Sequence, residues 1–512
     1  MSRRGFARLG LIAAIFAASL AHAGEVTSKE SGAKPIPKEL AGLRDRWVAA
    51  MDEFFVPGFA VVVVRDDEVI YIDTFGYRDL EKRLPVTPET SYYIASATKP
   101  FTAMGVMKLV EAGKVGLDDP VKKHLPRFEL PDAKQAASIT IRDLLSHKAG
   151  IDCGPAVFLD AYTGEITDDR YYKLLREHGE LAGAPSYSNI HFTLAGRVIE
   201  AASGKPWRDY LASAIFEPAG MRTATGYADA MYARADVALP YDLDDAGLSR
   251  CKVRKSDSTM HAAGGLGISI QDLGRWLRLN INRGEIDGVR IISEESATAM
   301  QTLQSDGAQG SIRVMQGFGL AWSIGPFRPE GPKYLMHSGG YIGTSAHTSF
   351  LPERKIGVGV LSNCGAPGGI FAESVVSIDV LDRLIGGEHP DYLEQLRSGM
   401  AKRLPELRER AAQEKNPAKV TASGSLTLSP DAYAGTYRSD DFGTAVVERD
   451  GDTLRIRFGS LPATMLSCQK DQFRVAAAGG VREGRFETEE GKVRAVVLQV
   501  EPGEARFVRS GG

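Results

Sequence analysis

The chain has 512 residues, of which 43% are hydrophobic and 25% are charged, as is ordinary for a globular protein with a substantial core. Its formal net charge of -3 gives no electrostatic reason to expect a nucleic acid or an anionic membrane surface as a partner. At this length we expect one large and one small domain.

Residues 1–23 have the pattern of an export signal. Three arginines flank the start of an apolar stretch from Leu9 to Ala21, which ends in the small-residue cleavage site Ala21-His22-Ala23. We expect a periplasmic or secreted protein that begins near Gly24 and has no stable membrane insertion after cleavage. An uncleaved anchor is the alternative, although the stretch is shorter than the roughly 20 residues that span a bilayer. The export route is left open between the general and the twin-arginine systems.

The segment after the signal predicts a helix followed by a β-hairpin. Apolar residues recur at helical spacing over residues 42–56. A strand through Val61–Val64, a turn at Asp66-Asp67 and a returning strand at Val69–Asp73 follow.

A serine and a lysine three residues apart stand where an apolar strand is expected to give way to a helix. Residues three apart on a helix share a face, so the Lys99 amine can lie beside the Ser96 hydroxyl and lose its proton if it is desolvated. Such a pair would make a serine nucleophilic without a histidine. The helix is indicated by a buried stripe and a stop signal: Ala103, Val106, Met107, Val110 and Gly113.

The same spacing occurs three more times, at Ser31/Lys34, Ser249/Lys252 and Ser467/Lys470. Only Ser96 and Lys99 have the strand-to-helix context. The simpler alternative is that Ser96 caps a solvated helix start.

Residues 100–300 are expected to be mainly helical with long loops, and they contain the only Tyr-x-Asn in the chain, Tyr187-Ser188-Asn189. A tyrosine on a loop before a helix can reach into a cleft, where the ammonium of Lys99 would lower its pKa and let the phenolate accept the serine proton. Asn189 would hold Lys99 and a substrate amide by hydrogen bonds. The alternative is a turn in which Asn189 caps the helix.

A third motif, His337-Ser338-Gly339-Gly340, begins a predicted glycine-rich strand. Glycines there would let a substrate backbone lie flush against the strand, and the Gly340 amide could pair with that of Ser96 as an oxyanion hole. A tight hairpin turn is the alternative. Lys148-Ala149-Gly150 and Lys355-Ile356-Gly357 are weaker rivals with a similar pattern.

The far end of the large domain mirrors its start. Three strand-like segments precede a helix with one apolar stripe, and their ranges are Gly317–Ile324, Ala346–Leu351, Ile356–Ser362 and Ile370–Ile385. We expect the first and last elements to share one antiparallel sheet-and-helix layer.

The last part of the chain changes character. Residues 389–425 are charged and interrupted by prolines, which suits a linker. From Tyr433 onward short strands are predicted, with Leu454, Ile456 and Phe458 alternating with arginines. A small antiparallel β-barrel over residues 426–512 is the natural interpretation.

The four cysteines, Cys153, Cys251, Cys364 and Cys468, are too far apart in the chain for a compact zinc cluster. The nine histidines show no His-x-x-x-His spacing, so no metal or other cofactor is expected. If a disulfide exists, Cys153 with Cys251 is the favoured pair; buried free thiols are the alternative.

Taken together, the chain resembles the serine hydrolases of the beta-lactamase and penicillin-binding-protein type, whose motifs Ser-x-x-Lys, Tyr-x-Asn and a variant of Lys-Thr-Gly occur here in order. The resemblance extends over about residues 40–385 and includes Ile139–Gly150, Gly264–Asp272 and His337–Gly343. It implies an α/β fold for a domain that spans residues 24–388. This domain would be a beta-lactamase-like sandwich, in which an antiparallel sheet flanked by helices lies beside a helical subdomain. The C-terminal part is similar to the small barrels that accompany such hydrolases.

The resemblance also implies roles for the motif residues. Ser96 attacks an acyl carbon, Lys99 and Tyr187 handle the protons, and the amides of Ser96 and Gly340 stabilise the oxyanion. Asn189 and His337 complete the expected catalytic set, and Gly339 the expected substrate-binding strand. Tyr187 favours the branch that includes class C beta-lactamases, D-aminopeptidases, some D,D-peptidases and esterases.

One departure from the family pattern bears on the substrate. His337 stands where many relatives carry lysine, and an imidazole of ordinary pKa is only about one-quarter charged at pH 7. We therefore expect an exported acyl-enzyme hydrolase of small peptide, amide or ester substrates, including D-amino-acid peptides, rather than of substrates with a free carboxylate. The alternatives are a beta-lactamase or D,D-carboxypeptidase, and a non-catalytic sensor of peptidoglycan fragments. The oligomeric state is left open.

Overall fold

A computed structural model describes residues 36–244, 247–307, 315–365, 368–387, 390–399, 426–451, 453–477, 480–500 and 503–510. The predicted signal at 1–23 and, of the predicted linker, residues 389 and 400–425 lie outside the described residues.

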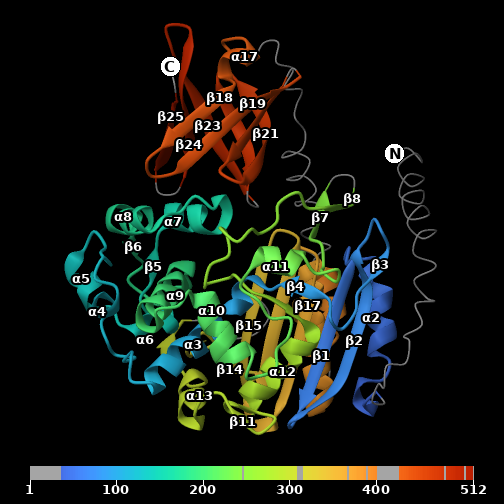
Figure 1. Ribbon diagram of the computed structural model, residues 1–512. Coiled ribbons are helices and arrows are strands. Elements are labelled where there is room, and N and C mark those ends of the chain that lie inside the picture. Colours follow the sequence, from blue (N-terminus) through green and yellow to red (C-terminus); the bar gives the residue numbers. More distant parts are fainter. Residues whose placement is uncertain are drawn as a thin grey trace, which may run out of the picture.

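A nine-stranded antiparallel sheet forms the centre of the larger part of the molecule (Figure 1), in the order β12-β13-β14-β15-β16-β17-β1-β2-β3. Its strands are β1 (Gly58–Arg65), β2 (Glu68–Asp79), β3 (Leu84–Pro85), β12 (Ser305–Asp306), β13 (Gly317–Phe318), β14 (Ser323–Pro326), β15 (Lys333–Tyr341), β16 (Thr344–Leu351) and β17 (Ile356–Ser362). Strand β1 pairs with β2 on one side and β17 on the other, which confirms that the two ends of this part share one sheet.

Strand β1 is buried on both faces, as its valine run predicts. Because side chains alternate along a strand, Val62 and Val64 join one apolar cluster and Val61 and Val63 join another. The first cluster holds helix α12 (Ile270–Ile281) and the helical subdomain. The second holds α2 (Leu43–Met51), the π-helical η7 (Phe371–Val376) and α15 (Ser377–Ile385). The short helix α14 (Gly368–Ile370) immediately precedes η7.

The helical subdomain lies between β4 and β12 in the chain, as predicted for the middle segment. Its further helices are η3 (Ala95–Thr98), α3 (Lys99–Glu111), α4 (Val121–His124), α5 (Ala133–Ser138), α6 (Ile141–Leu145), α7 (Gly154–Phe158), η4 (Leu159–Thr163), α8 (Asp168–His178), α9 (Asn189–Ser203), α10 (Trp207–Leu211), η5 (Ala212–Phe216), α11 (Ala228–Tyr232) and α13 (Glu294–Met300). Two-stranded pairs join β4 (Ser91–Tyr93) to β9 (Gly267–Ser269), β5 (Ile151–Asp152) to β6 (Glu180–Leu181), β7 (Tyr241–Asp244) to β8 (Gly247–Arg250) and β10 (Glu285–Ile286) to β11 (Val289–Arg290). Short 3-10 turns are η2 (Lys38–Leu40) and η6 (Pro352–Arg354).

Two predicted boundaries were wrong. The first helix, expected over residues 42–56, ends at Met51 and is followed by turns. The single strand expected at Gly317–Ile324 is two short strands, β13 and β14, because the chain reverses between them, with Ala321 at φ 71°.

The C-terminal part is a closed eight-stranded antiparallel barrel, as predicted. It consists of a short helix α17 (Pro430–Tyr433) and strands β18 (Gly435–Ser439), β19 (Gly443–Asp450), β20 (Thr453–Phe458), β21 (Leu461–Gln469), β22 (Gln472–Ala477), β23 (Gly480–Glu489), β24 (Lys492–Gln499) and β25 (Glu504–Arg509). Leu454, Ile456 and Phe458 are buried in its core.

The barrel rests on the α7–α8 region of the helical subdomain (Figure 1). The Thr444 amide donates to Glu165 Oε2 at 2.6 Å, and the Ser460 amide donates to the Thr163 carbonyl at 3.0 Å. Phe158 packs against Phe458 with ring centroids 6.3 Å apart. The contact therefore combines an apolar centre with hydrogen bonds to the backbone.

Cys153, Cys251 and Cys364 are free thiols, so the favoured Cys153–Cys251 bridge was wrong. Cys153 lies at the start of α7, with its sulfur 3.6 Å from the Leu174 carbonyl, whereas Cys251 follows β8. The side chain of Cys468 lies outside the described residues. Among the helices of the described ranges, none combines the length and apolar character needed to span a bilayer.

Candidate active site

The first motif lies at a sharp turn between a strand and a helix, as the sequence predicts. Strand β4 ends at Tyr93, the turn η3 carries Ser96, and α3 begins at Lys99 with Pro100 in its first turn. Ala95 adopts φ +44°, a backbone conformation that non-glycine residues rarely take. The turn is fixed from behind, since the Tyr93 hydroxyl donates to the Gly264 carbonyl.

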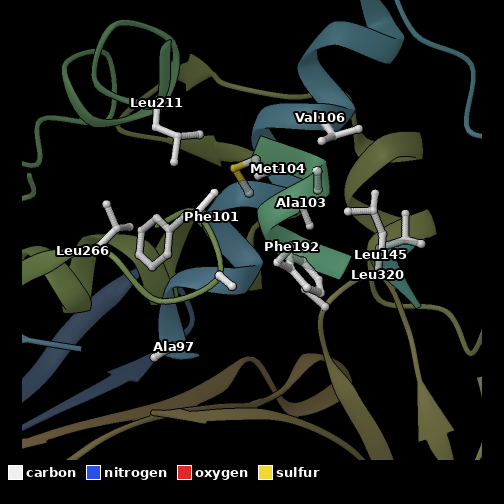
Figure 2. Packing of buried hydrophobic residues seen from close by; sticks show 14 of the residues in the cluster. Ala97, Phe101, Ala103, Met104, Val106, Leu145, Phe192, Leu211, Leu266 and Leu320 are labelled. Atoms are coloured by element: carbon white, nitrogen blue, oxygen red, sulfur yellow. The ribbon is translucent and has the colours of Figure 1, made fainter. Parts of the chain in front are cut away.

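Helix α3 is anchored along most of its length by apolar packing. Figure 2 shows Ala103, Met104 and Val106 pointing toward neighbouring helices and loops, with Phe192 and Leu145 close by. The predicted stripe is buried at Ala103, Val106 and Met107, while Val110 is partly buried. This packing holds the first turn of α3, and with it Lys99, in a fixed position.

Lys99 is completely buried, and its amine has three hydrogen-bond acceptors. Nζ lies 3.0 Å from Ser96 Oγ, 2.8 Å from Asn189 Oδ1 and 2.8 Å from the Ala263 carbonyl. Burial lowers the pKa of Lys99 well below its usual range. Desolvation therefore favours the neutral form of this amine, which has a serine hydroxyl within hydrogen-bonding distance.

The second motif lies at the start of α9. Ser188, not Asn189, caps this helix by accepting a hydrogen bond from the Ile190 amide, which leaves the Asn189 side chain to face Lys99. Lys99 Nζ is 4.8 Å from the centroid of the Tyr187 ring. The structure therefore brings Ser96, Lys99, Tyr187 and Asn189 together.

The pKa of Tyr187 shifts opposite to our expectation. The residue as a whole is 46% exposed, but its phenol oxygen, which sets the pKa, hydrogen-bonds Ser96 inside the site. Burial there raises the pKa of Tyr187, and the bond to Ser96 opposes the rise only in part. The predicted lowering was wrong because desolvation of the phenol outweighs the favourable hydrogen bond to Ser96.

The third motif runs along an open edge of strand β15. Strand β14 pairs only with Lys333–Met336, so β15 from His337 to Tyr341 has a partner, β16, on one side only. A Cβ on Gly339 would lie 1.9 Å from the Ile94 carbonyl oxygen, so only glycine fits against the Ser96 turn. The space over Gly340 is open to 4 Å, which leaves room for a ligand backbone.

His337 is buried and faces Tyr187, with ring centroids 6.1 Å apart. Its Nδ1 donates to the Ser338 carbonyl at 2.8 Å. Burial, reinforced by the nearby Lys99, lowers the pKa of His337 to about 3, so the imidazole is neutral at pH 7. His337 is therefore more completely neutral at pH 7 than an imidazole of ordinary pKa, which is about one-quarter charged.

The rival motifs lie elsewhere. Lys148 is exposed, with Asp143 3.8 Å away, and Lys355 occupies the turn between β16 and β17. Ser249 and Lys252 belong to the β7–β8 hairpin and the segment after it, and Lys470 lies in a barrel turn. Ser31 and Lys34 lie outside the described residues.

Sequence reasoning missed two histidines that support the tyrosine loop. His147 and His191 approach through their Nδ1 atoms at 2.9 Å, and His147 Nδ1 also accepts from the Ser188 amide at 3.3 Å. The His147 ring lies 4.5 Å from that of Tyr187. His147 belongs to the family-like phrase Ile139–Gly150, but nothing in its spacing from Tyr187 indicated this contact.

Next to these residues a cavity of about 720 Å³ opens between β15, η7 and the Tyr187 loop. Its wall includes Tyr187, His337 and Ser338 of the motifs, together with Tyr334, His347 and Glu373.

Comparison with known proteins places this geometry in a family. A family model described as Beta-lactamase matches residues 44–376, well over half of the chain. The chain belongs to the beta-lactamase family. Membership supports a serine hydrolase that works through an acyl-enzyme.

Individual relatives are distant. The chain is 24% identical over 313 residues to Protein flp of Staphylococcus aureus, matching 60% of this chain and 60% of that protein. It thus spans about three-fifths of the length of these curated relatives. It is 26% identical over 363 residues to penicillin-binding protein 4 of Amycolatopsis lactamdurans, with 70% of this chain and 93% of that protein covered.

Among solved structures, the octameric penicillin-binding protein homologue from Pyrococcus abyssi aligns over 92% of this chain and all of its own, with a TM-score of 0.58 and 26% identity. A class C beta-lactamase from Rhodobacter sphaeroides aligns over 67% of this chain and 99% of its own, with a TM-score of 0.54 and 20% identity. The latter likeness shows the fold alone. The predicted beta-lactamase-like fold is confirmed.

Proposed function

We propose that this beta-lactamase family member is an exported hydrolase that cleaves amide bonds, including those of D-amino-acid peptides, or ester bonds through an acyl-enzyme on Ser96. One observation carries the proposal: the buried amine of Lys99 lies 3.0 Å from Ser96 Oγ with Asn189 holding it from the other side. No surface role requires that arrangement.

In the proposed reaction, Ser96 Oγ attacks the acyl carbon while its proton moves to the neutral amine of Lys99. The amides of Ser96 and Gly340 stabilise the negative oxygen of the tetrahedral intermediate. Tyr187, whose raised pKa keeps it protonated, donates its proton to the departing nitrogen or oxygen and is reprotonated from Lys99. Water then attacks the acyl-enzyme, with the same groups returning the proton to Ser96.

The neutral His337 supports substrates without a carboxylate next to the scissile bond. A carboxylate gains most from a cation, and the imidazole supplies none at pH 7. Amides and esters therefore fit the site better than beta-lactams or D-Ala-D-Ala termini.

A fluorophosphonate probe followed by peptide mass spectrometry tests the nucleophile. We expect an adduct on Ser96 in the wild-type protein and none in Ser96→Ala. Folded protein without an adduct would instead favour a non-catalytic binding role.

A substrate panel tests the specificity. We expect D-alanine amides or p-nitrophenyl esters to be hydrolysed faster than a cephalosporin or a D,D-dipeptide. A cephalosporin turned over much faster than both would overturn the proposed substrate class.

A further inference from the structure

A chain of hydrogen-bonded groups ends on one carboxyl in the wall of the 720 Å³ cavity. The Tyr334 hydroxyl lies 3.4 Å from His347 Nε2, and His347 Nδ1 lies 2.8 Å from Ser338 Oγ. Glu373 is hydrogen-bonded to the Ser338 hydroxyl and to the Ala346 amide. An ionised carboxylate only accepts hydrogen bonds, so when Glu373 is ionised the Ser338 hydroxyl donates to it and His347 Nδ1 can donate to Ser338 in turn.

This carboxyl has no cationic partner among the described residues. The groups that face it are the imidazoles of His337 and His347, both neutral because burial lowers their pKa to about 3, together with the Cys364 thiol and the Tyr334 phenol. The acids of the adjacent helix α15 are engaged on the opposite side: Asp379 accepts from Trp47 and Asp382 from Arg328.

When Glu373 is ionised, its negative charge therefore has no neutralising partner in the described part of the chain, and a bound cation would supply one. The residue is partly buried and lines the cavity, and burial raises the pKa of Glu373 to about 8. A buried carboxylate is stabilised by a cation that hydrogen-bonds it directly. A primary ammonium entering the cavity would supply both charge and donors.

The position of the cavity identifies which part of a substrate enters it. Tyr187, whose phenol hydrogen-bonds Ser96, lines the cavity together with His337 and Glu373, whereas Ser96 itself is not part of the lining. A phenol that protonates the departing atom must border the departing group, so the cavity that it lines receives that group. At about 720 Å³ it has room for a substituent of several atoms.

We propose that Glu373 binds an ammonium on the departing part of the substrate, so that the preferred substrates are amides of diamines or esters of amino alcohols. This rests on the proposed function, since it assigns the leaving-group side of the same site. Glu373 is a specificity residue and takes no part in the proton transfers.

The test compares three amides of whichever acyl group is hydrolysed fastest: 2-aminoethyl, propyl and carboxymethyl. Wild type should prefer the aminoethyl amide over the propyl amide by about tenfold in kcat/KM, the effect of one hydrogen bond to a charged group. The carboxymethyl amide should be poorest. In Glu373→Gln the tenfold preference should vanish while propylamide hydrolysis stays within threefold, and Asp379→Asn on the adjacent helix should keep the preference.

The pH dependence of the aminoethyl-to-propyl ratio of kcat/KM is a second measurement. A purely structural role of Glu373 would not change this ratio with pH. Between pH 6 and 8.5 the aminoethyl-to-propyl ratio should rise as Glu373 ionises, because catalytic titrations cancel in the ratio. In Glu373→Gln the ratio should be flat. A wild-type enzyme without the preference, or a Gln variant that retains it, overturns the inference.

Binding to Ser96→Ala separates this inference from the proposed function. Calorimetry should show tighter binding of the aminoethyl amide than of the propylamide. The binding enthalpy should also depend on the buffer, because Glu373 releases a proton when the ammonium binds. If Ser96 is not labelled but this preference is present and is lost in Ser96→Ala/Glu373→Gln, the ammonium site stands and the hydrolase proposal fails. Equal binding of the two amides overturns the ammonium site whatever Ser96 does.

Discussion

Two buried lysines in this molecule share most of their physical properties and differ in one. Lys99 is completely buried and Lys255 nearly so. Burial lowers the pKa of both, to about 7 for Lys255 and well below the usual range for Lys99. By burial and basicity alone, either amine would qualify as a catalytic base.

The difference lies in what each amine contacts. Lys255 Nζ donates to the carbonyls of Ala161 and Thr259, and its nearest ring, Tyr341, has its centroid 4.2 Å away. Lys99 has a serine hydroxyl and an amide oxygen as partners. Burial favours the neutral form of an amine, which can accept a proton, but only a transferable proton beside it makes that amine useful as a base.

Lys255 instead supports the wall of the cleft. It lies within 5.6 Å of the ring centroids of Tyr93 and Tyr162 as well as near Tyr341. Tyr93 ends the strand before Ser96, and Tyr341 follows Gly340 on β15. The lysine therefore holds together two elements that carry the proposed oxyanion amides.

Replacing each of the two lysines in turn tests this difference most directly. Lys99→Met should lower kcat/KM by about a thousandfold, since a positioned base contributes about 10² to 10⁴. Lys255→Met should lower it less than tenfold, because that amine touches no reacting atom. Steady-state kinetics on one ester and one amide measure both, with circular dichroism to verify folding. Equal losses would mean that Lys255 also takes part in the chemistry.

Tyr187→Phe should have the next largest effect, and it should depend on the leaving group. An amide nitrogen must be protonated to depart, so amide hydrolysis should fall by about a hundredfold. A p-nitrophenolate departs without a proton, so acylation by that ester, measured as the rate of the burst phase, should change less than fivefold. Equal losses with the two substrates would contradict the proton-donor role of the phenol.

Motif spacing predicted the core of the site because helix geometry fixes it. Ser96 and Lys99 are three residues apart at a helix start, so their contact follows from local structure. The barrel was predictable for the same reason, since the alternation of Leu454, Ile456 and Phe458 is a local property of a strand.

What depends on distant contacts was not predictable. The pKa of Tyr187 was predicted in the wrong direction, because desolvation of its phenol depends on tertiary packing that motif spacing does not encode. Glu373 and Lys255 carry no motif at all. Their surroundings come from strands and loops tens to hundreds of residues away, such as Ser338 for Glu373 and Tyr93 for Lys255.

A smaller effect concerns stability. The folded-state pKa of Lys255 is about 7, against about 10.5 when unfolded, so between these values the unfolded chain binds more protons. The free energy of unfolding should therefore rise with pH from about 7 upward, by at most about 1.4 kcal/mol per pH unit from this group. Below pH 7 its contribution should be flat.

Urea unfolding of wild type and Lys255→Met at pH 7, 8 and 9 checks this, because the other titrating groups cancel in the difference. The free energy of unfolding of the wild type should increase relative to that of the variant as pH rises. A difference independent of pH would mean that Lys255 remains protonated in the folded protein, held by its carbonyl partners and the tyrosine rings.

The smallest effect should come from the rival pair Ser249 and Lys252, which has the same spacing as Ser96 and Lys99. Lys252 is exposed and lies beyond the end of β8, so its amine lacks the burial that Lys99 has, and spacing alone does not reproduce the site. Lys252→Ala should leave the rate of fluorophosphonate labelling at Ser96 within twofold of wild type, with no adduct on Ser249 in either protein. A loss of labelling would show that the exposed Lys252 influences the nucleophile. Burial of the lysine partner would then no longer distinguish Ser96 from the rival serines.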